Sequence, residues 1–219
     1  MNRDYDLIVF DWDGTLMDST AHIVRSIQAA CVDLGLPVPS RERASYVIGL
    51  GLTDAMRYAC PGLEEARYRE MVDAYRRHYL AGDAGVDLFE GVAEALRDYK
   101  EQGVFLAVAT GKSRVGLDRV LALSGLVEIF DCTRTVDECH SKPHPQMLEQ
   151  ITDYLGVVPQ RALMIGDTTH DLQMALNAGM PSVGVSYGAH PESDLLALNP
   201  VACFARFEEL HPWLRARIN

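Results

Sequence analysis

The chain has 219 residues, 48% of them hydrophobic and 23% charged, a composition typical of folded globular proteins and unlike that of disordered or fibrous ones. Its 31 acidic residues outnumber 20 basic ones, and the resulting formal charge of −11 disfavours a surface that binds nucleic acid or anionic membranes. The sequence contains no C-x-x-C pair and no apolar run near the roughly 20 residues that cross a bilayer. We therefore expect a cytoplasmic protein with neither nucleic-acid nor membrane partners.

Short apolar runs alternate with helical patterns along the chain. The runs that predict strands are Leu7–Phe10, Phe105–Ala109, Ala162–Ile165 and Ser182–Val185. Because their apolar residues are continuous, both faces of each strand should be covered, as in a parallel sheet. Helical patterns follow at Val92–Gln102, Arg114–Leu123 and Pro143–Leu155. This order predicts an α/β fold with a doubly wound, mainly parallel, Rossmann-like sheet.

The segment after the first strand is different, because it contains no convincing strand from about residue 18 to residue 85. Apolar residues recur at helical spacing from Ile23 to Leu34, and a tyrosine stripe runs at helical spacing from Tyr68 to Tyr79. A connection of this length inside a compact domain should fold as a unit of its own. We predict an all-helical cap at residues 17–86, inserted into an α/β core formed by residues 1–16 and 87–219.

Two carboxylates, Asp11 and Asp13, follow the first strand. Ligands of open α/β sheets bind beyond the carboxyl ends of the strands, so Asp11 lies at the expected place for a site. Gly14 permits a sharp turn and a close approach of the backbone. Two such carboxylates can lie close together if a hard cation sits between them or if one is protonated. The pair therefore suits nucleophilic catalysis by one carboxylate with acid–base help from the other, although a solvated Asp-Gly turn is the alternative.

The next two motifs are suited to an anion. Thr110 and Gly111 end the second predicted strand and open a helix, where a hydroxyl and exposed amides can bind an anion or merely cap the helix. Lys142 precedes two prolines that flank His144 and stiffen the loop. A fixed ammonium there can bind a phosphoryl group and balance the charge on its oxygens, whereas His144 is expected to be structural.

Another carboxylate pair follows the third predicted strand. Asp167 lies at the strand end, and Asp171 can lie one helical turn further on, facing the same side. We expect Asp167 to bind a metal directly and Asp171 to support it or to pair with Lys142. Oxygen ligands of this kind favour Mg²⁺ over zinc, which prefers histidine and cysteine. The neighbouring His170 is expected to be exposed.

The ordered motifs D-x-D-G-T, T-G after a strand, K-P and G-D-x-x-x-D resemble those of the haloacid dehalogenase superfamily, and the resemblance spans nearly the whole chain. The helical insertion and the stretches Ala109–Arg114, Ser141–Pro145 and Gly184–Gly188 are similar to the phosphoglycolate phosphatase-like branch, which carries a small α-helical cap. The resemblance implies a Mg²⁺-dependent phosphatase that hydrolyses a small phosphomonoester through an aspartyl-phosphate intermediate.

The resemblance also implies a role for each motif residue. Asp11 would be the nucleophile, and Asp13 would protonate the leaving alcohol and then activate water. Mg²⁺ would be bound by Asp11, the backbone carbonyl of Asp13, and Asp167, with Asp171 supporting the metal or Lys142. The phosphate-binding residues would be Gly14, Thr110, Gly111 and Lys142, with Thr110 and Lys142 also counted as catalytic.

Other functions remain open at this point. A sugar phosphomutase would use the same acid pair and a cap, and a 2-haloacid dehalogenase would use the nucleophile but neither metal nor leaving-group acid. A phospho-acceptor signalling domain also uses an Asp, a hydroxyl, a Lys and Mg²⁺, but is shorter and lacks a helical insertion. The expected partner is a small phosphorylated metabolite, and the chain is expected to be a monomer or a homodimer. The cap segment Ile48–Leu52 has no charged group to bind a substrate carboxylate.

Overall fold

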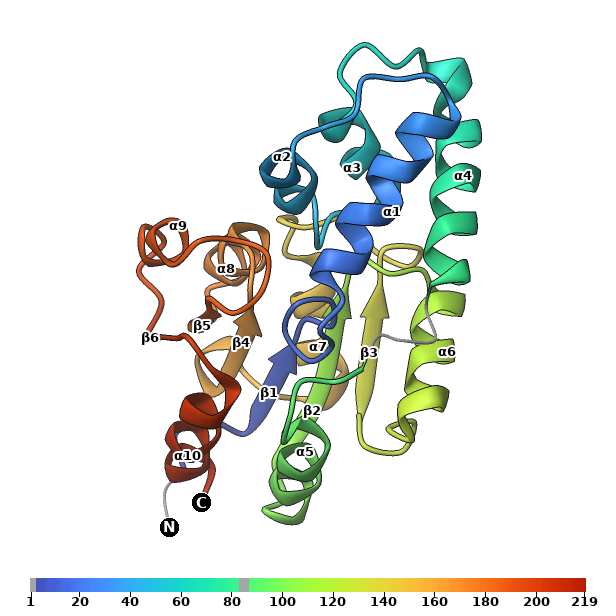
Figure 1. Cartoon of the computed structure of the whole chain (residues 1–219). Coiled ribbons are helices and arrows are strands. Elements are labelled where there is room, and N and C mark those ends of the chain that lie inside the picture. Colours follow the sequence, from blue (N-terminus) through green and yellow to red (C-terminus); the bar gives the residue numbers. More distant parts are fainter. Residues whose placement is uncertain (1–2, 83–86) are drawn as a thin grey trace.

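The computed structural model describes residues 3–82 and 87–219. Within these residues it contains a six-stranded parallel sheet in the order β3-β2-β1-β4-β5-β6 (Figure 1). The strands are β1 (Leu7–Phe10), β2 (Phe105–Thr110), β3 (Cys132–Thr135), β4 (Ala162–Gly166), β5 (Ser182–Val185) and β6 (Ala202–Phe204). The predicted doubly wound α/β fold is confirmed. Of these strands, only the two outermost, β3 and β6, both of them short, are not predicted from the sequence.

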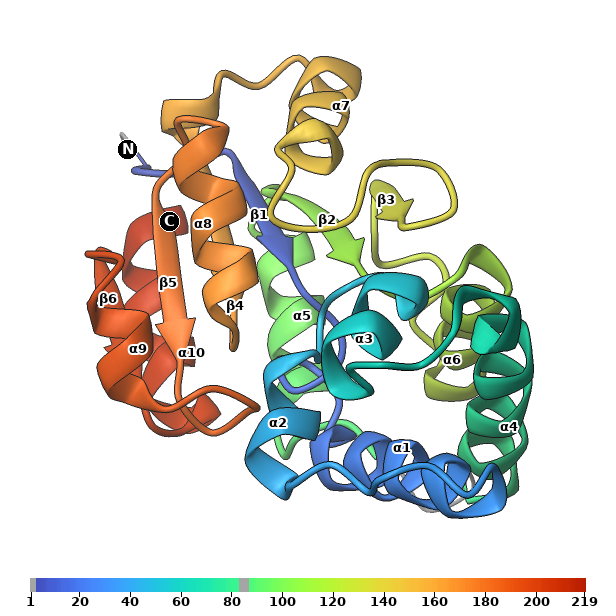
Figure 2. The same ribbon diagram turned by 90° about the horizontal axis from the view of Figure 1, so that it is seen from above.

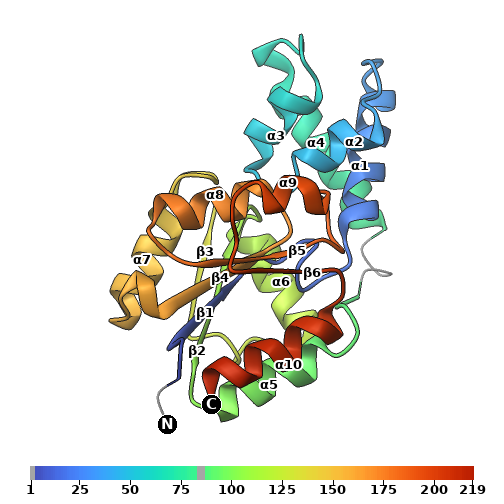
Figure 3. The same cartoon turned by 90° about the vertical axis from the view of Figure 1, so that its left-hand side faces the viewer.

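Helices cover both faces of the sheet, which explains the continuous apolar runs (Figure 3). Along β1, Ile8 and Phe10 face the cluster formed with α5 (Val92–Glu101), α6 (Arg114–Ser124) and α10 (Phe207–Ile218). Leu7 and Val9 face the opposite cluster, formed with α7 (Gln146–Leu155) and α8 (Thr169–Asn177). Alternate residues of one strand thus enter two different cores, and every residue of β1 is buried. A further short helix, α9 (Glu192–Leu196), lies beside β5 and β6.

The predicted core helices are confirmed, with one correction. The third of them is predicted to begin at Pro143, whereas α7 begins at Gln146 with Pro145 as its N-cap. The α conformation is disfavoured for a residue that precedes proline, and His144 precedes Pro145. Residues 141–145 therefore form a loop that projects Lys142 from the region before α7.

A separate helical layer lies beyond the carboxyl ends of the strands (Figures 1 and 2). It consists of α1 (Thr20–Asp33), α2 (Arg41–Tyr46), α3 (Leu52–Ala59), a 3₁₀ turn (Glu65–Arg67) and α4 (Tyr68–Ala81). These helices share an apolar cluster of their own, which includes Ile27, Met56 and Met71. We call this layer the cap. Its predicted limits of residues 17–86 stay a prediction, since residues 83–86 lie outside the described part of the chain.

None of the helices in the described part of the chain combines the length and apolarity that crossing a membrane requires.

Candidate active site

The centre of the sheet brings two of the predicted acids together. β1 and β4 are neighbours, and the chain order runs outward in opposite directions from them, so a crevice opens beyond their carboxyl ends. Asp11 directly follows β1, and Asp167 directly follows β4. The Asp11 backbone N–H donates to the carbonyl of Ile165 at 2.9 Å, which extends the pairing of the two strands up to the site.

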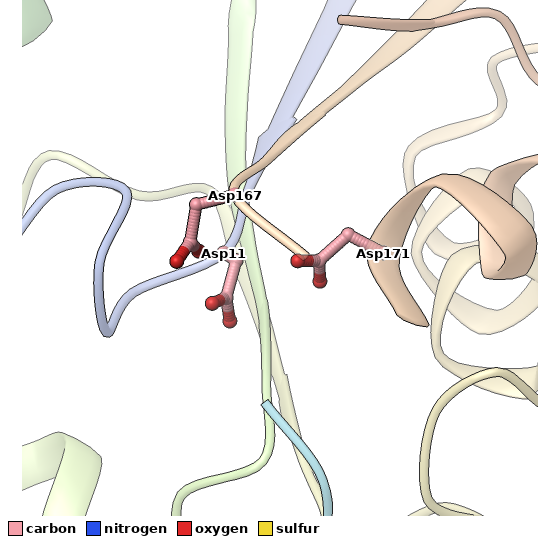
Figure 4. Close-up of side chains that lie close together, drawn as sticks. All are labelled: Asp11, Asp167 and Asp171. Carbon is pink, nitrogen blue, oxygen red and sulfur yellow. The ribbon is translucent and has the colours of Figure 1, made fainter. Parts of the chain in front are cut away.

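Three buried carboxylates meet at this crevice. Asp11, Asp167 and Asp171 each offer an oxygen, and these oxygens lie within 4.8 Å of one another (Figure 4). Asp11 Oδ2 is a buried oxygen without a hydrogen-bond partner among the described residues. A buried polar atom left unpaired is costly, so its position is explained by a further ligand. Three carboxylates with a vacant acceptor fit a hard divalent cation such as Mg²⁺.

Lys142 joins two of these carboxylates. Its ammonium donates to Asp11 Oδ1 and to Asp171 Oδ1, each at 2.6 Å, and its side chain is completely buried. The other oxygen of Asp171 accepts from the backbone and hydroxyl of Thr168, at 3.1 and 2.7 Å, in a capping box that opens α8. Asp171 therefore holds Lys142 on one side and the start of α8 on the other.

Asp167 is positioned by hydrogen bonds and by close packing. Its Oδ1 accepts from the Thr15 hydroxyl at 2.9 Å, and its Oδ2 accepts from the Ala189 backbone at 2.7 Å. A methyl group added at Gly14 or Gly188 would lie 2.1 or 2.2 Å from that Oδ2. Gly14 also has a φ of +85°, so the turn after β1 requires glycine both for its conformation and for its contact with Asp167.

The crowding of charge changes proton affinities. Burial raises the pKa of Asp11 to about 7; the Lys142 ammonium opposes this shift, and Asp171 and Asp13 add to it. Burial, followed by the charges of Asp11 and Asp171, also raises the pKa of Asp167 well above its usual range. Without a cation, the cluster thus favours a proton on its carboxylates, and a bound divalent ion would remove that preference.

Asp13 has a different set of partners, one of which connects it to the cap. Its Oδ1 accepts from the Ser19 hydroxyl at 2.7 Å, and the Lys112 ammonium lies 2.9 and 2.8 Å from its two oxygens. The same ammonium donates to the hydroxyl of Tyr79 on α4 at 3.0 Å. Lys112 and Ser19 are not predicted from the sequence as partners of Asp13. The motif T-G-K shows the lysine, but only the fold shows that it reaches a carboxylate 99 positions away.

The predicted anion site lies at the end of β2. Thr110 is buried, and its Oγ1 accepts from the backbone N–H of Lys112 at 3.2 Å. Gly111 lies against the cap, since an added methyl group would come within 2.5 Å of the Gly49 carbonyl. A second contact joins the same cap loop to the core: the Gly51 N–H donates to Ser141 Oγ at 2.8 Å. The loop between α2 and α3 therefore packs directly on the strand ends.

His170 differs from the prediction, because it is buried rather than exposed. Its Nε2 lies 2.8 Å from the carbonyl of Tyr46, at the end of α2, and His190 Nε2 lies 3.1 Å from the same carbonyl. The Tyr46 ring stacks on His190. Sequence analysis could not detect this contact, because it depends on where the cap rests on the core. His144 is exposed and accepts from the Gln146 backbone at the start of α7.

A cavity of about 630 Å³ lies between the cap and the core and is lined by Asp13, Gly111 and Lys112 on its catalytic side. The volume falls in the range of small-molecule sites. A cavity that reaches Asp13 and the lysine paired with it is a candidate substrate site.

Residues 8–185 match the haloacid dehalogenase-like hydrolase family. The chain belongs to the haloacid dehalogenase-like hydrolase family. This hydrolase is 37% identical to "Probable phosphatase IndB" of Dickeya dadantii, over 93% of its own length and 91% of the relative's. It is 32% identical to pyrophosphatase PpaX of Bacillus cereus, covering 94% and 95% of the two chains.

Solved structures agree with the fold of this hydrolase. The crystal structure described as a predicted phosphoglycolate phosphatase from Haemophilus somnus superposes with a TM-score of 0.83 at 28% identity. The superposition covers 94% of this chain and 96% of that one. The likeness therefore extends over the cap as well as the core.

Proposed function

We propose that this hydrolase is a Mg²⁺-dependent phosphatase that cleaves a phosphomonoester through an aspartyl-phosphate on Asp11. The observation that carries the proposal is the environment of Asp11: one carboxylate oxygen is held by Lys142, and the other is buried without a hydrogen-bond partner among the described residues. Relatives named as a phosphatase and a pyrophosphatase, which span nearly the whole chain, support phosphoryl transfer as the reaction class.

The arrangement divides the reaction between two carboxylates. A carboxylate oxygen of Asp11 attacks phosphorus, the ester P–O bond breaks, and Asp13 gives its proton to the departing alcohol oxygen. Asp13 then takes a proton from water, which attacks phosphorus, and the bond between phosphorus and the Asp11 oxygen breaks to release phosphate. Lys142 and the hydroxyl and amide groups at Thr110 and Gly111 would balance the charge of the phosphoryl oxygens.

The proposed metal ligands are Asp11, the backbone carbonyl of Asp13, and Asp167. Asp171 is not proposed as a direct ligand, because its two oxygens already accept hydrogen bonds from Lys142 and Thr168. It would support the site by holding Lys142 in place. When bound, Mg²⁺ would neutralise part of the carboxylate and phosphate charge and orient the phosphate oxygens. The cap would exclude bulk water from the aspartyl-phosphate until Asp13 activates a single water.

The two alternative enzyme functions, dehalogenase and phosphomutase, explain the groups of this site less well. A 2-haloacid dehalogenase needs neither a leaving-group acid nor a carboxylate cluster for a cation, and Asp13 and the buried cluster are placed to serve as these in a phosphatase. A sugar phosphomutase would use the same groups and would return the phosphoryl group to sugar instead of water. We propose hydrolysis on the strength of the phosphatase relatives, with a small phosphorylated metabolite as substrate and a cytoplasmic setting for a monomer or a homodimer.

The proposal is tested with purified protein and p-nitrophenyl phosphate, with and without Mg²⁺. We expect release of p-nitrophenol that requires Mg²⁺ and is lost with a chelator, and an Asp11→Asn variant that stays folded but inactive. Turnover without metal, or near-normal activity of Asp11→Asn, would overturn it.

The role of Asp13 is tested separately with Asp13→Asn. Loss of the acid should cost about 10²–10⁴-fold, more with an alkyl phosphate than with p-nitrophenyl phosphate, whose leaving group needs no proton. An equal loss for both substrates would contradict the role of Asp13 as leaving-group acid.

A further inference from the structure

The cavity between cap and core is largely apolar beyond its catalytic side. Asp13 and Lys112 line one part of it, and most of the remaining wall is aliphatic or aromatic. The apolar residues of the wall come from both the cap and the core. The cap contributes Ile23, Ile48, Leu50, Leu52 and Met56 among others, and the core contributes Val136 on the other side. A leaving group that extends from a phosphate at Asp11 past Asp13 would therefore meet hydrocarbon.

The size of the cavity also bears on the leaving group. A volume of 630 Å³ corresponds to about 20 water molecules at about 30 Å³ each. A two-carbon acid such as glycolate, or a second phosphate as in pyrophosphate, would fill only a small part of this space. Both would also place negative charge beside an apolar wall, which is unfavourable.

Charged residues of the cavity do not change this conclusion. The Lys112 ammonium is engaged with Asp13 and Tyr79. Arg76, Arg119 and Asp137 also line the cavity, but all three are exposed, which places them at its solvent side. Asp137 also accepts a hydrogen bond from the backbone N–H of Arg114. The segment between α2 and α3 that rests on Gly111 carries Leu50 and no charged residue. The wall of the cavity beyond Asp13 and Lys112 is thus suited to an apolar group.

We infer that the preferred substrate is a phosphomonoester of an alcohol with an apolar body of several carbons, aliphatic or aromatic, which fills this cavity. The inference rests on the proposed phosphatase function and names the substrate class for it. Leu50, Leu52 and Val136 are half-buried residues of the wall and determine specificity by their contact with that body.

The test uses two homologous series, from the methyl to the hexyl compound: n-alkyl phosphates as substrates and n-alkylphosphonates as ligands that cannot be hydrolysed. With Mg²⁺ present, affinity for the phosphonates, measured by calorimetry, should rise about fourfold for each buried methylene until the cavity is filled. The kcat/KM values of the phosphates should rise in parallel, and phosphoglycolate and inorganic pyrophosphate should be poor substrates.

Two variants locate the effect. Leu50→Asn keeps the number of side-chain heavy atoms and adds a polar amide, so it should flatten the chain-length dependence of phosphonate affinity. Val38→Ser makes a similar change at an exposed cap residue that does not line the cavity, and the dependence should persist. Wild-type phosphonate affinity that does not change with chain length, or equal behaviour of the two variants, would overturn the inference.

The two proposals fail differently. If p-nitrophenyl phosphate is hydrolysed with Mg²⁺ while phosphonate affinity is independent of chain length, the phosphatase stands and the apolar substrate class is wrong. If phosphonate affinity rises with chain length but no phosphate ester is hydrolysed, the cavity takes apolar ligands and the proposed reaction is wrong.

Discussion

The ammonium of Lys112 binds both carboxylate oxygens of Asp13, at 2.9 and 2.8 Å, and so holds the proposed general acid in one orientation. Only about a tenth of each side chain is exposed. Burial works against the charge of Lys112, but Asp13 and then Tyr79 outweigh it and raise the pKa of the ammonium. Because Tyr79 belongs to α4, this one lysine links the acid of the core to the cap.

Replacing Lys112 with methionine should therefore impair the acid without removing it. We expect Lys112→Met to lower kcat by at least about tenfold, and by less than the 10²–10⁴-fold that a positioned general acid contributes. The loss should be larger for alkyl phosphates than for p-nitrophenyl phosphate. Tyr79→Phe keeps the ring and the Lys112–Asp13 pair, so its effect on kcat should be smaller. Identical losses for the two substrates would show that Lys112 does not act through Asp13.

Lys142 is expected to contribute to stability as well as to activity. Its ammonium lies between Asp11 and Asp171, and all three side chains are essentially unexposed. Removing one partner of a buried ion pair typically costs about 3–5 kcal/mol. We expect Lys142→Met to lower the free energy of unfolding by that amount in metal-free buffer, measured by urea denaturation, and to abolish turnover.

The control for this variant is an ion pair on the solvent-exposed surface of the same protein. Arg206 and Glu209 lie 2.7 Å apart on the surface, with 68% and 41% of their side chains exposed. An exposed pair contributes about 0–1 kcal/mol, so Arg206→Met should have little effect. Similar unfolding free energies for the two variants would contradict the importance assigned to the buried lysine.

The site motifs could be located from sequence because they follow strands that are buried on both faces. The apolar runs before Asp11, Thr110 and Asp167 are continuous, so the ends of three adjacent strands could be predicted. Parallel strands end at the same edge of a sheet, which brings these residues together without further information. β3 carries Thr133 and Arg134 and so lacks the apolar run, which is why it is missed.

The contacts between cap and core could not be predicted in the same way. The Lys112 ammonium donates to the Tyr79 hydroxyl, and the Tyr46 carbonyl lies within hydrogen-bond distance of His170 and His190. Both contacts depend on the angle at which the cap rests on the strand ends. No periodicity in the sequence encodes that angle, which depends on close packing such as that of Gly111 against the Gly49 carbonyl. The cavity between cap and core is formed by the same packing. Its wall segment Ile48–Leu52 could be singled out from sequence, but the space that the packing encloses could not.

The turn after β1 offers a test of how close packing positions Asp167. Gly14 and Gly62 have nearly the same φ, +85° and +91°, in the region that favours glycine. A methyl group at Gly14 would lie 2.1 Å from Asp167 Oδ2, whereas one at Gly62 would have no described atom within 4 Å. Gly62→Ala should cost about 1–2 kcal/mol from backbone strain and leave activity intact.

Gly14→Ala carries the same strain but also displaces Asp167. Misplacing a catalytic group by about 1 Å can cost about 100-fold in rate, so we expect a loss of at least that size, together with weaker activation by Mg²⁺. Titrating activity against Mg²⁺ for both variants measures the difference. If Gly14→Ala and Gly62→Ala respond alike to Mg²⁺, the contact with Asp167 does not position a metal ligand.

The carboxylate cluster makes stability depend on pH in a direction opposite to that of most carboxylates. The folded pKa of Asp11 is about 7, because of burial first and despite the nearby Lys142 ammonium, whereas an unfolded Asp has a pKa of about 3.9. The folded protein thus holds a proton that the unfolded chain releases. The contribution of Asp11 is fully present below pH 4 and is lost as pH rises through 7.

In metal-free buffer, wild-type protein should therefore lose unfolding free energy relative to Asp11→Asn as pH rises from about 5 to 8, because an amide cannot ionise. Urea denaturation of both proteins across that range measures how the ionisation of Asp11 and its effect on Asp167 change stability, since the groups outside the cluster are shared. Mg²⁺ should remove the difference by stabilising the ionised carboxylate. A wild-type protein that gains stability over Asp11→Asn as pH rises without metal would show that the cluster tolerates its charge without a cation.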